Sequence, residues 1–127
     1  MQQPLPHRPG ATEGPGPLSR LERAVLTAIL KGGDDLAPLR AQLAGATVVS
    51  RTHSGVGFMT RIDVPDALPS AVEGIAARLR PVLADHPQLA ERAEFLLQLR
   101  AGRLAVLEAY CFEGGWPADE AEFRVVG

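Results

Sequence analysis

The sequence has little of several features that define common classes of protein. Only one cysteine occurs among the 127 residues, which excludes an internal disulfide and a cysteine-rich zinc site. The formal net charge is −2, so the basic excess that nucleic-acid binding requires is missing. No apolar run approaches the ~20 residues of a membrane-spanning helix. We therefore expect a cytoplasmic protein that binds neither nucleic acid nor membranes.

Motifs for metals and nucleotides are also missing. The three histidines, His7, His53 and His86, show neither helical i, i+4 spacing nor an HExxH pattern. The glycines at 55 and 57 lack the third glycine of a dinucleotide-binding loop, and no phosphate-loop lysine follows a glycine run. We therefore expect no metal and no cofactor.

The chain divides into a tail and one domain. Residues 1–17 are rich in proline and glycine and offer little apolar surface to offset the entropy of ordering them. They are predicted to form a flexible tail, and residues 18–127 are predicted to form a single α+β domain.

Two helices are predicted at the start of this domain. Apolar residues recur at three- and four-residue spacing from 18 to 30, and Ser19 with Glu22 has the spacing of a capping box. A second apolar stripe follows an aspartate cap at 34 or 35 and ends at Gly45. The pair is predicted to be an N-terminal helical hairpin.

Strands are expected after Gly45. Residues 47–49 are β-branched, and residues 56–64 alternate so that Phe58, Thr60 and Ile62 share one face. Residues 51–55 are predicted to form a loop or bulge between the two runs. Ser70 and Glu73 again have capping-box spacing, which predicts a helix over residues 70–80 before Pro81 and a short strand that begins at 82.

Residues 94–112 fit two structures equally well. Their leucine, alanine and glutamate content favours a helix that breaks at Gly102. The alternative is a β-hairpin around Ala101-Gly102, with apolar runs of strand length on both sides. That hairpin places Phe95, Leu97 and Leu99 on one face of the first strand and Leu104, Val106, Glu108 and Tyr110 on one face of the second.

Three short motifs resemble those of a loose group of small uncharacterised bacterial proteins. They are Gly55-Val56-Gly57-Phe58, Leu107-Glu108-Ala109-Tyr110 and Trp116-Pro117, and the resemblance covers residues 18–126. The sequence departs from the group at Ala109, where glycine is usual, and at Cys111, where a small polar residue is usual. The resemblance implies a β-hairpin for 94–112 and implies no activity.

The last twenty residues are the best candidates for a binding site. Four of the six aromatic residues of the chain lie there, together with five acids and one arginine. Aromatic side chains anchor protein interfaces, and surrounding charge steers a partner of opposite sign. The candidate partner-binding residues are Glu108, Tyr110, Glu113, Trp116, Asp119, Glu120 and Glu122. The alternative is that the aromatic side chains pack the C-terminus onto the sheet.

Catalytic groups are sparse. His53 and Cys111 are the two residues from which a catalytic histidine–thiol pair would be built. A cysteine between Tyr110 and Phe112 is, however, more typical of a buried, inert thiol. No catalytic residue is therefore assigned.

The sequence as a whole predicts an α+β fold, with the helical hairpin packed on an antiparallel sheet of about four to five strands. It predicts a small non-enzymatic protein, immunity- or antitoxin-like, that binds a basic protein partner. A homo-oligomeric structural module, and a small hydrolase that uses His53 and Cys111, remain as alternatives.

Overall fold

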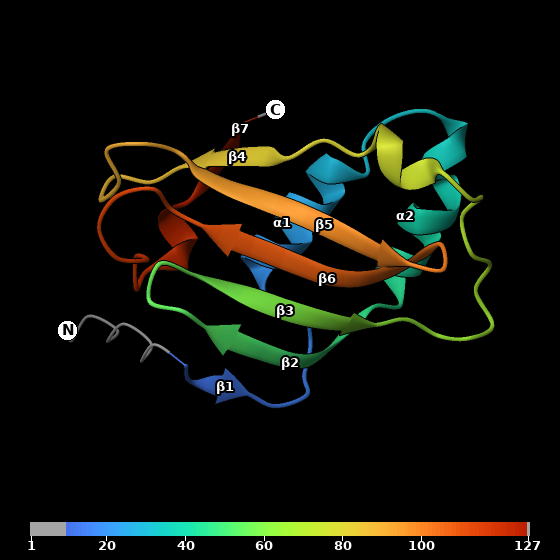
Figure 1. Ribbon diagram of the computed structural model, residues 1–127, viewed down its shortest axis with the longest axis horizontal. Helices are drawn as coiled ribbons and strands as arrows, with labels where there is room; N and C mark the ends of the chain where they lie inside the picture. Colours follow the sequence, from blue (N-terminus) through green and yellow to red (C-terminus); the bar gives the residue numbers. More distant parts are fainter. Residues whose placement is uncertain (1–9, 127) are drawn as a thin grey trace.

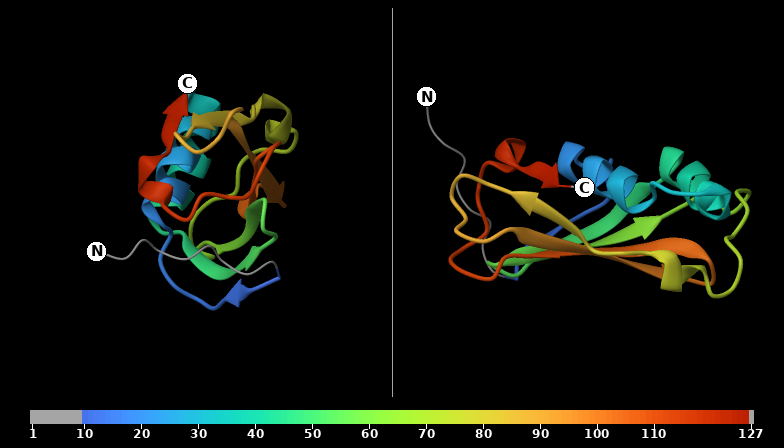
Figure 2. Two further views of the ribbon diagram at one scale, coloured as in Figure 1. Left: turned by 90° about the vertical axis from the view of Figure 1, so that its left-hand side faces the viewer. Right: turned by 90° about the horizontal axis from the view of Figure 1, so that it is seen from above.

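A computed structural model describes residues 10–126, which form one antiparallel sheet with both α-helices on the same face (Figures 1 and 2). The seven strands lie in the order β1-β2-β3-β6-β5-β4-β7. In chain order the elements are β1 (Thr12–Glu13), α1 (Arg20–Ile29), the 3₁₀ turn η1 (Asp34–Leu36), α2 (Ala37–Ala44), β2 (Thr47–His53), β3 (Gly57–Asp63), η2 (Ile75–Arg78), β4 (Val82–Asp85), β5 (Ala93–Arg100), β6 (Arg103–Tyr110), η3 (Glu120–Glu122) and β7 (Arg124–Val126).

The α+β class is confirmed, but two details of the predicted architecture are wrong. The sheet has seven strands rather than four to five, because the short pairs β1–β2 and β4–β7 extend it on both sides. The two helices do not form an N-terminal hairpin unit. Strand β1 precedes them, and α1 packs against β4, β5 and β7 while α2 packs against β6.

Residues 10–17 differ from the predicted flexible tail. Thr12 and Glu13 pair with Thr52 and Arg51 of β2, and Gly16 bridges to Val48. The backbone of this segment is therefore tied to the edge of the sheet, which sequence composition alone does not indicate. Residues 1–9, the rest of the predicted tail, lie outside the described residues.

Helix α1 begins where the sequence predicts. The Ser19 amide N–H donates to Oε1 of Glu22 at 2.8 Å, and the Glu22 N–H donates to Oγ of Ser19 at 3.0 Å. This reciprocal capping box satisfies two amides that the first helical turn leaves without helical partners. Glu22 is also fully buried, so its carboxylate lies between α1 and the sheet and also needs partners there.

Alternation along the strands separates two faces of the sheet. As predicted, Phe58, Thr60 and Ile62 of β3 are buried against the helices, whereas Met59, Arg61 and Asp63 are exposed on the opposite face. Bulges in β2 and β6 shift this alternation. In β6 the register skips Ala105, so Leu104 and Leu107 point into the core while Val106, Glu108 and Tyr110 point away. The expectation that Leu104 shares a face with Val106 is therefore wrong.

The hairpin alternative for residues 94–112 is the observed one. Its turn residues, Ala101 and Gly102, both have positive φ values, of 51° and 74°. A Cβ on Gly102 would lie 2.4 Å from the Ala71 carbonyl oxygen, so the turn requires glycine there. The fully buried amide of Gln42 in α2 fixes this end of the hairpin: it donates to the carbonyls of Gly102 and Pro69 and accepts from the Leu104 N–H.

The predicted helix over residues 70–80 is wrong. Only Ile75–Arg78 is helical, as the 3₁₀ turn η2, and Gly74 before it has a φ of 86°. A glycine in a left-handed conformation interrupts any helix that starts at Ser70. The short strand expected from 82 is present as β4.

Candidate functional site

A buried polar network joins α1 to the helix-covered face of the sheet. The guanidinium of Arg51 in β2 donates from Nε to Oε2 of Glu22 at 2.8 Å and from Nη2 to Oε1 at 2.5 Å. Thr60 of β3 donates its hydroxyl to the same carboxylate at 2.5 Å. Glu22 thus receives donors from a helix cap and two strands, which locks α1 onto β2 and β3.

Strand β1 closes this network from the edge of the sheet. Oε2 of Glu13 lies 2.5 Å from Nε2 of His53 and 3.4 Å from Nη1 of Arg51. Burial by itself raises the pKa of Glu22, but the hydrogen bonds from Arg51, Thr60 and the Ser19 amide outweigh it and hold that pKa below its ordinary value. Burial likewise raises the pKa of Glu13, and His53 and Arg51 together lower it overall. Both carboxylates are therefore held in the charged form.

Cys111 and His53 are bound to different partners. The Cys111 thiol is buried and contacts the Gly114 carbonyl oxygen at 3.7 Å, while His53 pairs with Glu13. Burial raises the pKa of the Cys111 thiol, so its reactive thiolate form is disfavoured at neutral pH. This environment is that of an inert core thiol and does not favour the hydrolase alternative.

The predicted partner-binding residues separate into two sets. Trp116 is buried, and its ring packs edge-on against Phe58 and Phe95 at centroid distances of 5.5 and 5.9 Å. Its indole N–H donates to Oε2 of Glu120 at 2.8 Å. Trp116 thus serves the core, as the alternative interpretation of this segment expects.

Residues 119–123, later in the same C-terminal segment, also have internal partners. The Asp119 carboxylate accepts from the Ala121 N–H at the start of η3, and its carbonyl lies 2.8 Å from Nε2 of the buried His86. The ring of Phe123 packs edge-on against His86 and at a tilt against Trp116, at centroid distances of 4.7 and 4.9 Å. Of the seven candidates, the exposed or half-exposed ones outside this packing are Glu108, Tyr110, Glu113 and Glu122.

Glu108 and Tyr110 lie on the face of the sheet that α1 and α2 leave uncovered, here called the open face (Figure 2). Strand register places the side chains of this face in four rows across β3, β6 and β5. The rows are, in order, Tyr110 with Glu94; Met59, Glu108 and Leu96; Arg61, Val106 and Gln98; and Arg103 with Arg100.

One end of the open face is acidic and aromatic. The Tyr110 hydroxyl donates to Oε2 of Glu94 at 2.6 Å, and this bond, followed by burial and the charges of Glu94 and Glu108, raises the pKa of Tyr110 to about 12. The ring of Phe112 packs edge-on against Tyr110 at 5.3 Å and is 54% exposed. Glu94, Glu108, Tyr110 and Phe112 are called the acidic–aromatic end below.

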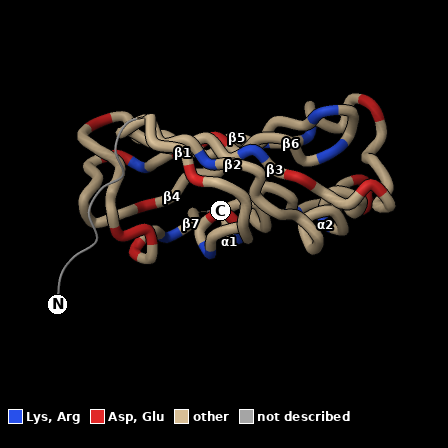
Figure 3. The backbone as a smooth tube through the Cα atoms, turned by 90° about the horizontal axis from the view of Figure 1, so that it is seen from below, with Lys and Arg blue, Asp and Glu red and all other residues tan. Residues whose placement is uncertain are grey.

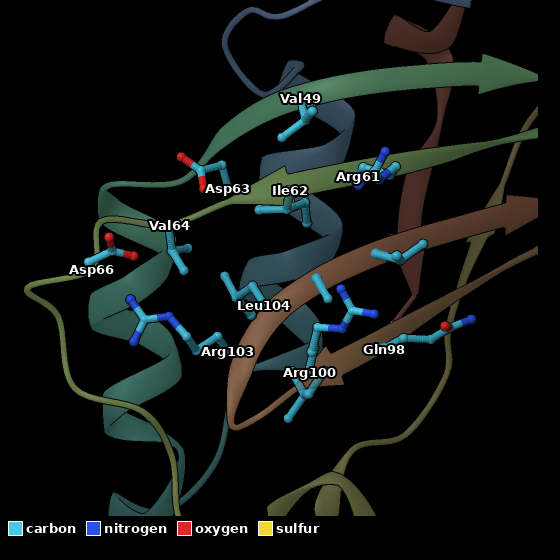
Figure 4. A pocket seen from close by; sticks show the side chains of 13 residues that line it. Val49, Arg61, Ile62, Asp63, Val64, Asp66, Gln98, Arg100, Arg103 and Leu104 are labelled. Carbon is cyan, nitrogen blue, oxygen red and sulfur yellow. The ribbon is translucent and has the colours of Figure 1, made fainter.

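The other end of the open face carries arginines around an open pocket of about 460 Å³, which Asp63 and Asp66 also line (Figure 4). Arg61 and Arg100 lie on one side of this pocket with Gln98, and within residues 10–126 neither forms an ion pair. On the other side, Arg103 donates to the carbonyls of Leu68 and Pro65. Figure 3 shows two basic segments close together at this end of the sheet. Arg61, Arg100 and Arg103 are called the arginine end.

Sequence reasoning missed the polar network and the arginine end. The network carried a signal, since Arg51 and His53 stand two residues apart in a β-branched segment and so share one strand face. The arginine end carried none, because the rows that form it depend on strand pairing and on the Ala105 bulge.

The part of the chain that the structure describes holds no group of three or more histidine, cysteine or acidic side chains placed to bind a metal, and no helix in it has the length and apolar character to cross a membrane. Comparison with known protein families, curated proteins and solved structures finds no match for this chain.

Proposed function

We propose that this chain is a non-enzymatic protein-binding module that holds a basic partner against the acidic–aromatic end of its open face. The observation that carries this proposal is Phe112, which is 54% exposed and packs edge-on against Tyr110, whose hydroxyl donates to the carboxylate of Glu94. Met59 of β3, 44% exposed, lies next to Glu108 of β6 and extends the apolar surface on that side.

The chemistry of this end suits a basic protein. An exposed aromatic ring gives a partner a large apolar contact at little cost in side-chain entropy. Tyr110 is already held by Glu94 on one side and by Phe112 on the other, so little ordering is needed on binding. Glu94 and Glu108 attract lysine and arginine side chains and speed the encounter.

This proposal narrows the surface expected from the sequence. Trp116, Asp119 and Glu120 have internal partners, so the binding residues proposed are Glu94, Glu108, Tyr110, Phe112 and the exposed Glu113. An immunity- or antitoxin-like inhibitor of a basic protein, acting in the cytoplasm, is the narrower role that we propose within this class.

A comparison of three tagged chains tests the proposal. The wild type is set against a variant with Glu108→Gln and Phe112→Ser, and against a matched control with Glu73→Gln and Val72→Ser. Val72 and Glu73 form an exposed apolar–acidic pair in the loop before η2, and Val72 is 69% exposed. We expect the wild type and the control to capture the same basic protein from source-cell lysate and the open-face variant to lose it. Equal capture by all three would contradict the proposal.

A further inference from the structure

The open face carries opposite charges at its two ends. Glu94 and Glu108 occupy rows one and two, and Arg61 and Arg100 occupy rows three and four. Between them lies an apolar centre of Met59, Val106 and Leu96, which are half-buried or exposed. Asp63 and Asp66 line the pocket beside the arginines, so the complementarity rests on the four charges within the rows, and a reversed copy of the face brings Glu94 and Glu108 to Arg100 and Arg61.

From this pattern we infer that a second copy of the same chain binds the open face and forms a two-fold symmetric dimer. The inference rests on the proposed function, because it names the source of the basic groups that meet the acidic–aromatic end. A two-fold interface uses the same patch on both copies and therefore requires self-complementarity.

The strand register fixes which residues meet. A two-fold axis that runs across the strands between rows two and three, parallel to the sheet, places row one of each copy over row four of the other. Strand β5 then faces β5 of the second copy, so Glu94 lies opposite Arg100. Row two lies over row three, which brings Glu108 of β6 next to Arg61 of the neighbouring strand. The strands of the two sheets run nearly in line, the usual arrangement when sheets pack face to face.

Shape supports the same pairing. The arginine end has a pocket of about 460 Å³, and the exposed Phe112 packs against Tyr110 at the opposite end of the face. Arg103 is fixed in this pocket by the carbonyls of Leu68 and Pro65, so its wall is formed before binding. In the dimer each Phe112 lies toward the pocket of the other copy. Row two lies over row three, so Met59 and Leu96 of one copy flank Val106 of the other.

Charge reversal tests the dimer directly by sedimentation and light scattering. The acid variant carries Glu94→Arg and Glu108→Arg, and the base variant carries Arg61→Glu and Arg100→Glu. We expect a wild-type particle of twice the chain mass of 13.5 kDa and at least tenfold weaker self-association for each variant alone, because like charges then meet. A one-to-one mixture is expected to form a heterodimer of wild-type affinity, since every contact in it is again between opposite charges.

The control reverses two charges elsewhere. Arg23→Glu with Lys31→Glu changes the net charge as the base variant does, at exposed positions on and just after α1, and should leave the dimer intact. A wild type that remains a 13.5 kDa monomer up to ~100 µM would overturn the inference, as would a dimer that neither variant weakens or a mixture that does not associate. A monomeric wild type that captures a basic protein through Phe112 leaves the proposed function standing. A wild type that dimerises and captures no other basic protein would keep the acidic–aromatic end as a binding surface and restrict its partner to a second copy of this chain.

Discussion

Arg51 and Arg61 lie on adjacent strands of one sheet but on opposite faces, and their surroundings differ completely. Arg51 is nearly enclosed, and its guanidinium meets the carboxylate of Glu22 with two hydrogen bonds. Arg61 is exposed beside the open pocket and has no ion pair among residues 10–126. The charge of Arg51 on the helix-covered face therefore helps to hold the fold together, whereas the charge of Arg61 on the open face meets no acidic side chain among residues 10–126 in an ion pair.

The largest loss of stability is expected from removal of the Glu22 side chain on the helix-covered face. Glu22→Ala leaves the Arg51 guanidinium without its main partner and removes the half of the capping box in which the Glu22 carboxylate accepts from the Ser19 N–H. We expect the free energy of unfolding in urea to fall by about 3 to 5 kcal/mol. The combined replacement Glu22→Leu with Arg51→Met should lose less, because it leaves no unpaired buried charge. A loss below about 1 kcal/mol for Glu22→Ala would contradict this account of the network.

The same carboxylates should make the fold sensitive to acid. The folded-state pKa values of Glu22 and Glu13 lie below the ordinary value of 4.5. Their contribution to stability is therefore fully present above pH 4.5 and is lost as the pH falls through the lowered folded-state values. Urea unfolding at a series of pH values should show this loss, and Glu22→Gln should make the curve flatter. A wild type and a Glu22→Gln variant with parallel curves would show that Glu22 is not the titrating group.

On the open face, the Tyr110–Glu94 contact can be measured through one chromophore. Tyr110 is the only tyrosine of the chain, so the ultraviolet absorbance of tyrosinate reports on it alone. We expect Glu94→Gln to lower the pKa of Tyr110 from about 12 toward 10.0, because the hydrogen bond to a charged acceptor is lost. Glu108→Gln acts only through charge and should lower it less. An unchanged pKa in Glu94→Gln would remove Glu94 from this contact.

A smaller effect on stability is expected from a substitution in the turn between β5 and β6. Ala101 has a φ of 51°. This left-handed conformation is unfavourable for most L-residues, and asparagine tolerates it better than alanine does. We expect Ala101→Asn to raise the free energy of unfolding by about 0.5 to 1 kcal/mol without a change at either face. Gly102→Ala is the opposing variant. It should lower the free energy of unfolding, because the new Cβ would collide with the Ala71 carbonyl oxygen.

The smallest effect on stability is expected at Arg61. Arg61→Gln removes an exposed charge that no acidic side chain in the described chain pairs with, so the free energy of unfolding should stay within about 0.5 kcal/mol of the wild type. Self-association should weaken in the same variant. A large loss of stability would mean that Arg61, like Arg51, helps to hold the fold together.

Local sequence signals located the parts of the fold that depend on neighbouring residues. The capping box at Ser19 and the alternation at Phe58, Thr60 and Ile62 are set by spacing along the chain, and both are confirmed. The helix expected from Ser70 failed because Gly74 takes a positive φ. The edge strands escaped prediction because strands as short as β1 and β7 are stabilised by their partners rather than by their own sequence.

The candidate site was predictable only in part. Composition pointed to the C-terminal acids and aromatic residues, and Tyr110 and Glu108 do lie on the open face. Composition does not distinguish a ring that fills the core, such as Trp116, from one that remains exposed, such as Phe112. That distinction follows from the positions of the rings relative to the sheet, as does the separation of the acidic–aromatic end from the arginine end.

The most direct test of the open face as the association surface is the ¹³C-methyl NMR signal of Met59. The chain has two methionines, and Met59 lies at the apolar centre of the open face, so its signal is readily assigned by substitution. We expect this signal to shift as the protein concentration rises through the dimerisation range, and to stay at its dilute position in the Arg61→Glu, Arg100→Glu variant. A Met59 signal that does not move while the particle mass doubles would place the interface elsewhere and contradict the account.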